Sequence, residues 1–187
     1  MDIFSHGLWA GAVGKGLNDF ILKPKLKKPL KLKWLVLWGI FPDIFSFAIP
    51  FIWLFWSLAF GNFKLSDLPR PESMEPAASN HLPWVFQLAN FLYNFSHSFV
   101  IFLLIFAVVF IIFKRPVWEL SGWLLHIIID IPTHSYQFYP TPFLWPVSSI
   151  KFNGFSWATP WFLIANYAAI FLVYLILFIK KKKRDRI

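Results

Sequence analysis

The chain has 187 residues, of which 58% are hydrophobic and only 14% are charged, and its formal net charge is +9. Long apolar stretches with so few charges are typical of a membrane protein and exclude an ordinary soluble domain. The positive charge does not indicate a nucleic-acid partner, because the lysines form short blocks beside apolar runs. The absence of cysteine excludes disulfides and thiolate metal ligands. We therefore expect a single membrane-embedded domain over residues 1–187, with a basic C-terminal tail at 180–187.

The hydropathy pattern predicts an all-α integral membrane protein with about five membrane segments. The first segment, residues 3–20, is Gly-rich, and we expect it to be short or re-entrant. Pro42 and Pro50 interrupt the second segment, which we expect to break there. The four longer apolar segments cover residues 34–60, 84–113, 117–131 and 157–179.

An aromatic and proline-rich loop occupies residues 132–156. Asn153-Gly154 is a two-residue turn signal and predicts a β-hairpin in this loop. The Trp and Tyr side chains suit a membrane interface. They fit either the mouth of a site or simple anchoring of the loop, and the pattern does not choose between them.

The basic residues predict the orientation in the membrane. Segments 21–33, 114–115 and 180–186 hold six, two and six Lys and Arg residues, whereas the alternating loops 61–83 and 132–156 hold two and one. The positive-inside rule places the basic set in the cytoplasm. We therefore expect a multi-pass protein of the inner (plasma) membrane, with a cytoplasmic C-terminus and a site that faces outward.

His126 and Asp130 are ionisable residues inside an apolar segment, LLHIIID. Each such group costs about 2.5–3.5 kcal/mol on insertion scales, so a compensating partner is expected. The i, i+4 spacing brings both side chains to one helix face, where imidazole and carboxylate can bind one divalent cation. A hydrogen bond that joins two helices explains the pair equally well.

Asp43 follows Gly39 and Pro42 in the segment GIFPD, which predicts a helix break with the carboxylate at the start of the next half-helix. An aspartate that only caps a helix is common in water. Broken helices at membrane depth are tolerated mainly around a cavity or a buried site. This depth favours a functional role for Asp43.

Together with two further histidines, these residues form a candidate metal site on four segments. The expected ligands are His6, Asp43, His97, His126 and Asp130. Nitrogen and oxygen ligands without sulfur favour Zn²⁺, with Mn²⁺ and Fe²⁺ as alternatives. Thr133 and His134 follow Pro132, and we expect them to orient Asp130, unless His134 is itself a ligand.

Several segments in this order resemble a known family. They are SHGLWAG, GIFPD, the HS pair at His97, HIIIDIPTHS and FLWPVS. Together they resemble the inner-membrane metal-dependent hydrolases, a family with a LexA-regulated member, over nearly the whole chain. The resemblance implies that the five expected ligands are the family's polar set, with Thr133 alongside. Ser98 stands where the family usually has arginine, and His134-Ser135 stands where it has Pro-Tyr-Gly-like residues. The ligand order is also distantly similar to that of zinc-dependent phospholipases C, which suggests phosphoester substrates.

These observations predict a metal-dependent hydrolase that acts on a membrane lipid or lipid-linked substrate. Asp43 or Asp130 would take the proton from the attacking water. A small divalent-cation carrier, or a protein that only binds the metal, is the main alternative. A phosphatase that uses a His–Asp pair without metal is disfavoured, because Gly122 occupies the position where it needs arginine.

Overall fold

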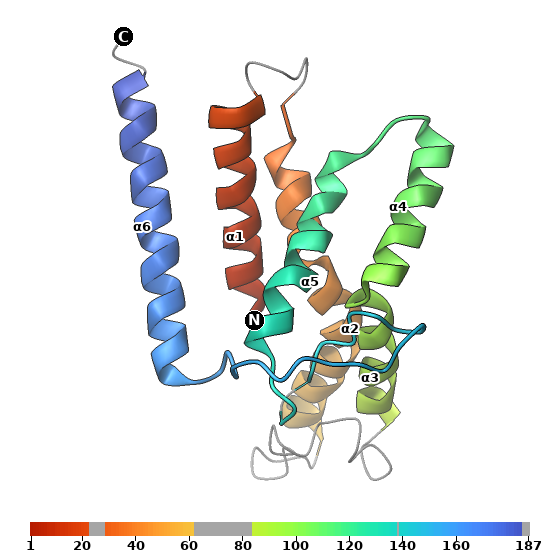
Figure 1. The fold of residues 1–187 in the computed structure, drawn as a ribbon. Helices are drawn as coiled ribbons and strands as arrows, with labels where there is room; N and C mark the ends of the chain where they lie inside the picture. Colours follow the sequence, from red (N-terminus) through yellow and green to blue (C-terminus); the bar gives the residue numbers. More distant parts are fainter. Residues whose placement is uncertain (23–28, 62–83, 138, 185–187) are drawn as a thin grey trace.

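The computed structural model describes residues 1–22, 29–61, 84–137 and 139–184, and within these ranges the chain is helical and forms no strand (Figure 1). This confirms the all-α prediction. The helices are α1 (Ile3–Gly16) with the π-helical turn η1 (Leu17–Leu22), α2 (Leu32–Phe60), α3 (Trp84–Ser96), α4 (Phe99–Phe113), the 3-10 turn η5 (Trp118–Leu120), α5 (Ser121–Thr133) and α6 (Pro160–Arg184).

Two of the described helices, α2 and the Pro160–Lys182 part of α6, are long and apolar enough to cross a membrane. The pair α3 and α4 passes the same criterion as one span that bends by 63°. Membrane location is therefore supported, but five spans are not confirmed. Helix α5 has 13 residues, or about 20 Å at 1.5 Å per residue, which is shorter than the roughly 30 Å of a bilayer core.

Helix α2 is the centre of the bundle and packs against α1, α3 and α5, while α6 packs against α1. In Figure 1 the end of η1, the beginning of α2, the connection from α4 to η5 and the end of α6 all lie at one end of the bundle. We call this end the basic end, because it carries Lys31, Lys114 and Lys180. The loop between α5 and α6 lies at the opposite end, which we call the loop end.

Two glycines allow α2 and α5 to approach closely. A Cβ atom on Gly122 of α5 would lie only 2.1 Å from the backbone oxygen of Leu35 and 2.9 Å from the nitrogen of Gly39, both on α2. A Cβ on Gly39 would in turn lie 2.7 Å from the Cβ of Ala10 on α1. Small residues at helix interfaces in membranes permit this backbone contact. The contact holds the following turn of α5, which carries His126, against α2.

Helix α2 is continuous through Pro42 and Pro50, so the predicted break is wrong. Asp43 is an interior helix residue and not a helix cap. A proline removes one backbone hydrogen bond, and for Pro42 the carbonyl that loses its partner is that of Trp38, four residues earlier. Near this point the Ser46 hydroxyl donates to the carbonyl oxygen of Pro42 at 2.8 Å, and His126 on α5 contacts the carbonyl of Gly39. These contacts tie the turn around Pro42 to its surroundings.

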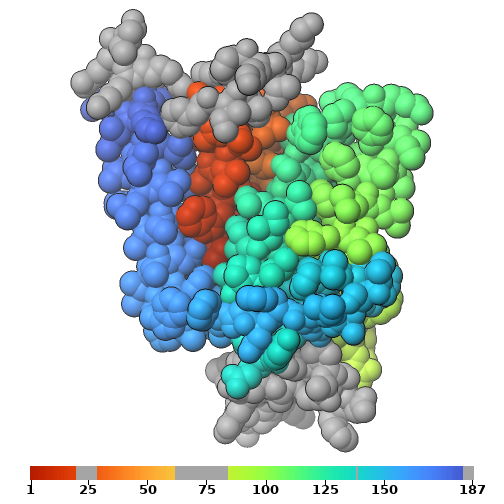
Figure 2. Space-filling view, viewed as in Figure 1, coloured from red at the N-terminus to blue at the C-terminus, as the bar shows by residue number. Residues whose placement is uncertain are grey.

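The β-hairpin expected at Asn153-Gly154 is not confirmed. No described glycine has a positive φ, which the predicted turn would require. The segment instead crosses the end of α5: Gly154 N donates to His134 O and Phe155 N to Pro132 O, each at 2.8 Å. A Cβ on Gly154 would lie 2.2 Å from the Pro132 oxygen, so glycine serves a close backbone approach here. Figure 2 shows this loop covering the lower part of the face in view.

Candidate metal centre

The His126 and Asp130 pair lies on the inner face of α5, as its spacing predicts. Both side chains are almost fully buried, and His126 Nε2 lies 3.1 Å from Asp130 Oδ2. A buried hydrophobic cluster of Phe102, Leu120, Trp123 and Ile127 joins α5 and its preceding turn to α4. The pair therefore sits in the bundle and away from lipid.

His97 lies at the bend between α3 and α4. Its backbone nitrogen still donates to Tyr93 O at 3.0 Å, but the next residue, Ser98, begins α4 by capping the nitrogens of its first turn. The indole of Trp123 donates to the carbonyl of Ser96 at 2.5 Å, which ties the bend to α5. The bend thus points the His97 ring at Asp130, with Nε2 at 3.3 Å from Oδ2.

Asp43 approaches from α2. Its Oδ1 lies 3.6 Å from His97 Nε2 and 3.7 Å from His126 Nε2. Its Oδ2 is buried and has no hydrogen-bond partner. A buried carboxylate oxygen without a partner is expensive unless a cation or a bound ligand completes its surroundings.

Asp43, His97, His126 and Asp130, which we call the central cluster, bring their ligand atoms close enough together to share one cation. One ligand atom from each lies within 4.8 Å of all the others. The separation of the two imidazole Nε2 atoms is 3.1 Å. The four separations from nitrogen to carboxylate oxygen are 3.1, 3.3, 3.6 and 3.7 Å. A tetrahedron with ligands at 2.0–2.2 Å from its centre has edges of roughly 3.3–3.6 Å. The central cluster could therefore hold a metal ion.

A carbonyl contact indicates which nitrogen of His126 faces the cluster. His126 Nδ1 lies 2.7 Å from Gly39 O. A carbonyl oxygen only accepts, so this Nδ1 donates its N–H, and in a neutral ring Nε2 carries a lone pair. His97 Nδ1 lies 2.8 Å from the Ser96 hydroxyl, which can donate or accept, and 3.2 Å from Tyr93 O. Carbonyl contacts on the outer nitrogen are typical of metal-binding histidines.

Asp130 divides its two oxygens between different partners. Oδ2 faces His97 and His126, whereas Oδ1 faces a second group on the other side. His6 Nε2 lies 2.9 Å and His134 Nε2 3.4 Å from Oδ1. The α-amino group of Met1 also donates to Oδ1. These contacts hold the carboxylate in one orientation.

His6 lies beside the central cluster and is not among the four residues whose ligand atoms come within 4.8 Å of one another. Its role as a ligand therefore stays a prediction. Its ring stacks on His126 with centroids 3.6 Å apart. Neither of its ring nitrogens makes a hydrogen bond of normal geometry. Of the two Asp130 oxygens, His6 Nε2 approaches the outer one and can orient it.

Of the two residues expected to orient Asp130, His134 does so and Thr133 does not. His134 Nδ1 lies 2.8 Å from the carbonyl of Tyr139, so Nε2 faces Asp130. The Thr133 hydroxyl instead donates to Ile129 O at 2.9 Å, within its own helix. In helices, a Ser or Thr hydroxyl commonly donates in this way to the backbone carbonyl four residues earlier.

Tyr93 and Tyr139 support the site and were not predicted from the sequence. Tyr93 stacks on the His97 ring at 3.7 Å and donates its hydroxyl to Tyr139 O at 3.0 Å. Burial raises the pKa of Tyr139 to about 12, so this loop residue stays a neutral phenol. The i, i+4 spacing from Tyr93 to His97 is the one sequence signal that indicates this pair. Tyr139 has no comparable signal, because tyrosine is common in aromatic loops.

No family model, curated protein or solved structure matches this chain. What the central cluster does must therefore follow from its own donor atoms and surroundings.

Proposed function

We propose that this chain is a membrane-bound hydrolase that depends on a divalent cation, preferably Zn²⁺, and cleaves a phosphoester or related bond of a membrane-associated substrate. The observation that carries the proposal is the compact set of two imidazoles and two carboxylates, buried and free of sulfur. Nitrogen and oxygen donors at this spacing suit Zn²⁺ better than the larger, oxygen-preferring Ca²⁺. The resemblance to inner-membrane metal-dependent hydrolases supports the same reaction class.

Three members of the central cluster would hold the cation, and the fourth would serve the reaction. The shortest separations join His97, His126 and Asp130, whereas Asp43 is the most distant member, at 3.6 and 3.7 Å. A catalytic zinc site typically has three protein ligands and one open position. Asp43 would therefore stand beside the open position. It also lines a cavity that reaches the site, and the other three members do not.

The bound cation would supply the charge that activates a water molecule and polarises the phosphoryl or carbonyl oxygen. Asp43 would then accept the proton of the attacking water on Oδ2, the oxygen that has no other partner. Asp130 would stay ionised and bind, with its orientation held by His6 and His134. Two carboxylates neutralise a divalent cation, which offsets the cost of burying these charges.

The orientation in the membrane is part of the proposal. The basic end would face the cytoplasm and the loop end would face outward across the inner membrane. The lysines at the ends of α2, α4 and α6 support this arrangement, because they lie at the same end of the bundle.

A divalent-cation carrier is the second candidate, and one observation favours it. Donor atoms continue past the central cluster, because His6 and His134 approach the outer oxygen of Asp130. Successive donors of this kind could pass an ion toward the loop end. A carrier would move the metal across the membrane without any hydrolysis.

The experiment compares purified wild type with Asp130→Asn in lipid nanodiscs. We expect wild type to contain close to one Zn²⁺ per chain and to hydrolyse labelled phospholipids or lipid-linked phosphates, with loss of activity on chelation. Asp130→Asn keeps the side-chain shape and should lose both properties. Asp19→Asn, which removes a charge paired with Lys15 away from the site, is the matched control and should keep both. Metal uptake into proteoliposomes without turnover would support the carrier, and activity that survives chelation would refute the proposal.

A further inference from the structure

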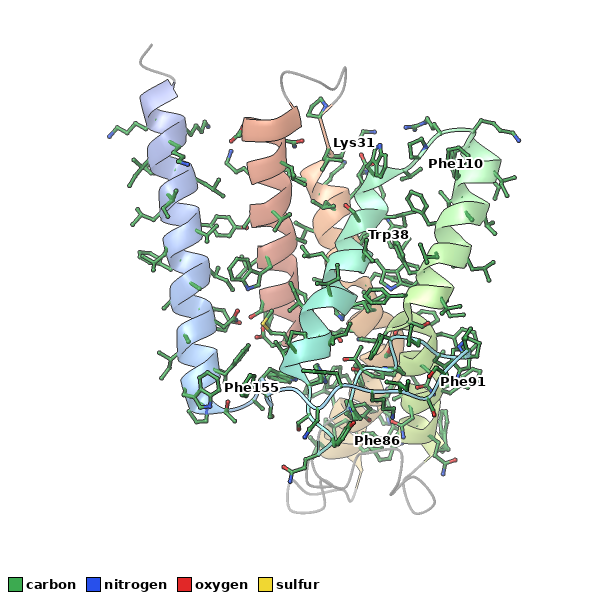
Figure 3. All side chains as sticks on the ribbon, in the orientation of Figure 1. Lys31, Trp38, Phe86, Phe91, Phe110 and Phe155 are labelled. Carbon is green, nitrogen blue, oxygen red and sulfur yellow. The ribbon has the colours of Figure 1, made fainter. Side chains whose placement is uncertain are left out.

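A cavity of about 400 Å³ lies beside the central cluster toward the loop end. Its walls come from the beginning of α1, the second half of α2, the first turn of α3 and the loop that follows α5. Its apolar side chains include Phe47, Phe51 and Leu54 of α2 and Phe86 of α3. Figure 3 shows Phe86 at the lower end of the bundle, at the same end as Phe155 and far from Lys31.

One part of the cavity wall is polar and belongs to the site. Asp43 and His134 both line it, and Asp43 Oδ2 is a buried carboxylate oxygen without a hydrogen-bond partner. The cavity therefore connects an apolar space to the position where the reaction is proposed to occur. A ligand that fills it can have an apolar part between α2 and α3 and a polar part at Asp43.

The lining also indicates how a ligand enters. Phe4 and Phe51, which line the cavity, are 79% and 44% exposed on the outside of the bundle. Large exposed apolar side chains on a membrane helix face lipid. An opening bordered by them admits an apolar chain from the bilayer more readily than a polar molecule from water. A water molecule inside would find few polar partners, so this volume suits a hydrocarbon.

We propose that this cavity binds the apolar chain of an amphiphilic substrate, a lipid phosphoester whose phosphate then reaches Asp43. The proposal rests on the proposed function for the identity of the phosphate group, but the chain-binding cavity can be tested separately. The chain enters laterally past Phe51 and lies against Leu54 and Phe86.

The test uses dodecyl phosphate that carries a photoreactive diazirine at the end of its chain. The probe is added to wild-type protein in nanodiscs without a catalytic assay, and the crosslinked peptides are mapped by mass spectrometry. We expect crosslinks at the second half of α2 and the beginning of α3. Leu54→Trp fills the cavity and should lower these crosslinks about tenfold, because the indole occupies the volume that the chain needs.

Ile52→Trp is the matched control, because Ile52 lies on the same turn of α2 but is 68% exposed and does not line the cavity. It should keep the wild-type crosslinks. The metal content of each variant reports whether the bundle still folds, and Leu54→Phe replaces Leu54→Trp if the larger residue is not tolerated. Crosslinks spread over α4 and α6 that do not respond to either Leu54 variant would refute the cavity proposal. Specific crosslinks without metal-dependent hydrolysis would refute the proposed function and leave chain binding supported.

Discussion

The Nε2 atoms of His97 and His126 lie 3.1 Å apart although the two residues are 29 positions apart in the chain. His126 donates its other nitrogen to Gly39 O, whereas His97 Nδ1 lies 2.8 Å from the Ser96 hydroxyl and 3.2 Å from Tyr93 O. A neutral His126 ring therefore presents a lone pair toward His97 and Asp130. A cation held between the two rings would satisfy this lone pair and the charge of the nearby carboxylate.

Replacing His97 with Ala should remove the cation, whereas replacing His6 with Ala should only weaken its binding. His97 faces the inner oxygen of Asp130, and His6 contacts only the outer one. Loss of an orienting residue typically lowers metal affinity by about 10–100-fold. Titration of metal-free protein with Zn²⁺, followed by calorimetry, measures both affinities. Equal losses in the two variants would contradict the assignment of His6 to the outside of the central cluster.

Asp43→Asn should separate metal binding from turnover. The three closer members of the central cluster can still hold the cation, so metal content should stay near the wild-type value. Removal of a general base lowers turnover by about 10²–10⁴-fold. The measurements are metal content and kcat on the same preparation. Loss of metal together with activity would show that Asp43 is a ligand and not the base.

Gly122→Ala should disrupt the site without changing any polar residue. The added Cβ would meet Leu35 O at 2.1 Å, and rigid backbone cannot move aside as a flexible side chain can. We expect α2 and α5 to separate, with a destabilisation of about 1–3 kcal/mol and a loss of Zn²⁺. Thermal unfolding in detergent and metal analysis check both effects. Gly16→Ala is the control, because a Cβ there has no neighbour within 4 Å.

The C-terminus should lie in the cytoplasm, so a reporter that works only in the cytoplasm should be active when it is fused there. Anionic lipid of the cytoplasmic leaflet adds about 1 kcal/mol for each basic residue near its surface, and the chain carries six Lys and Arg residues at 180–186. Paired reporters, one active only in the cytoplasm and one active only outside it, decide the orientation. Activity of the external reporter would reverse the proposed direction of the cavity.

The sequence by itself determined the properties that depend on composition and short-range spacing. The apolar content and the scarcity of charge are enough to predict a helical membrane protein. The i, i+4 rule is enough to place His126 and Asp130 on one helix face. The cost of burying charge also pointed to Asp43 and His97 as members of the same site. The structure brings all four together.

Only the tertiary structure decided how Asp43 reaches the site, where His6 and Thr133 lie, and what Gly154 does. The proline signal suggested a broken helix, yet α2 continues through Pro42, and the turn around it is held by the Ser46 hydroxyl and by α5. The hairpin signal at Gly154 was overridden by backbone hydrogen bonds to the end of α5. These outcomes depend on contacts between segments far apart in the chain, such as Gly39 with Gly122. Local propensities are weaker than the hydrogen bonds and close packing that such contacts provide, so no single segment could reveal them.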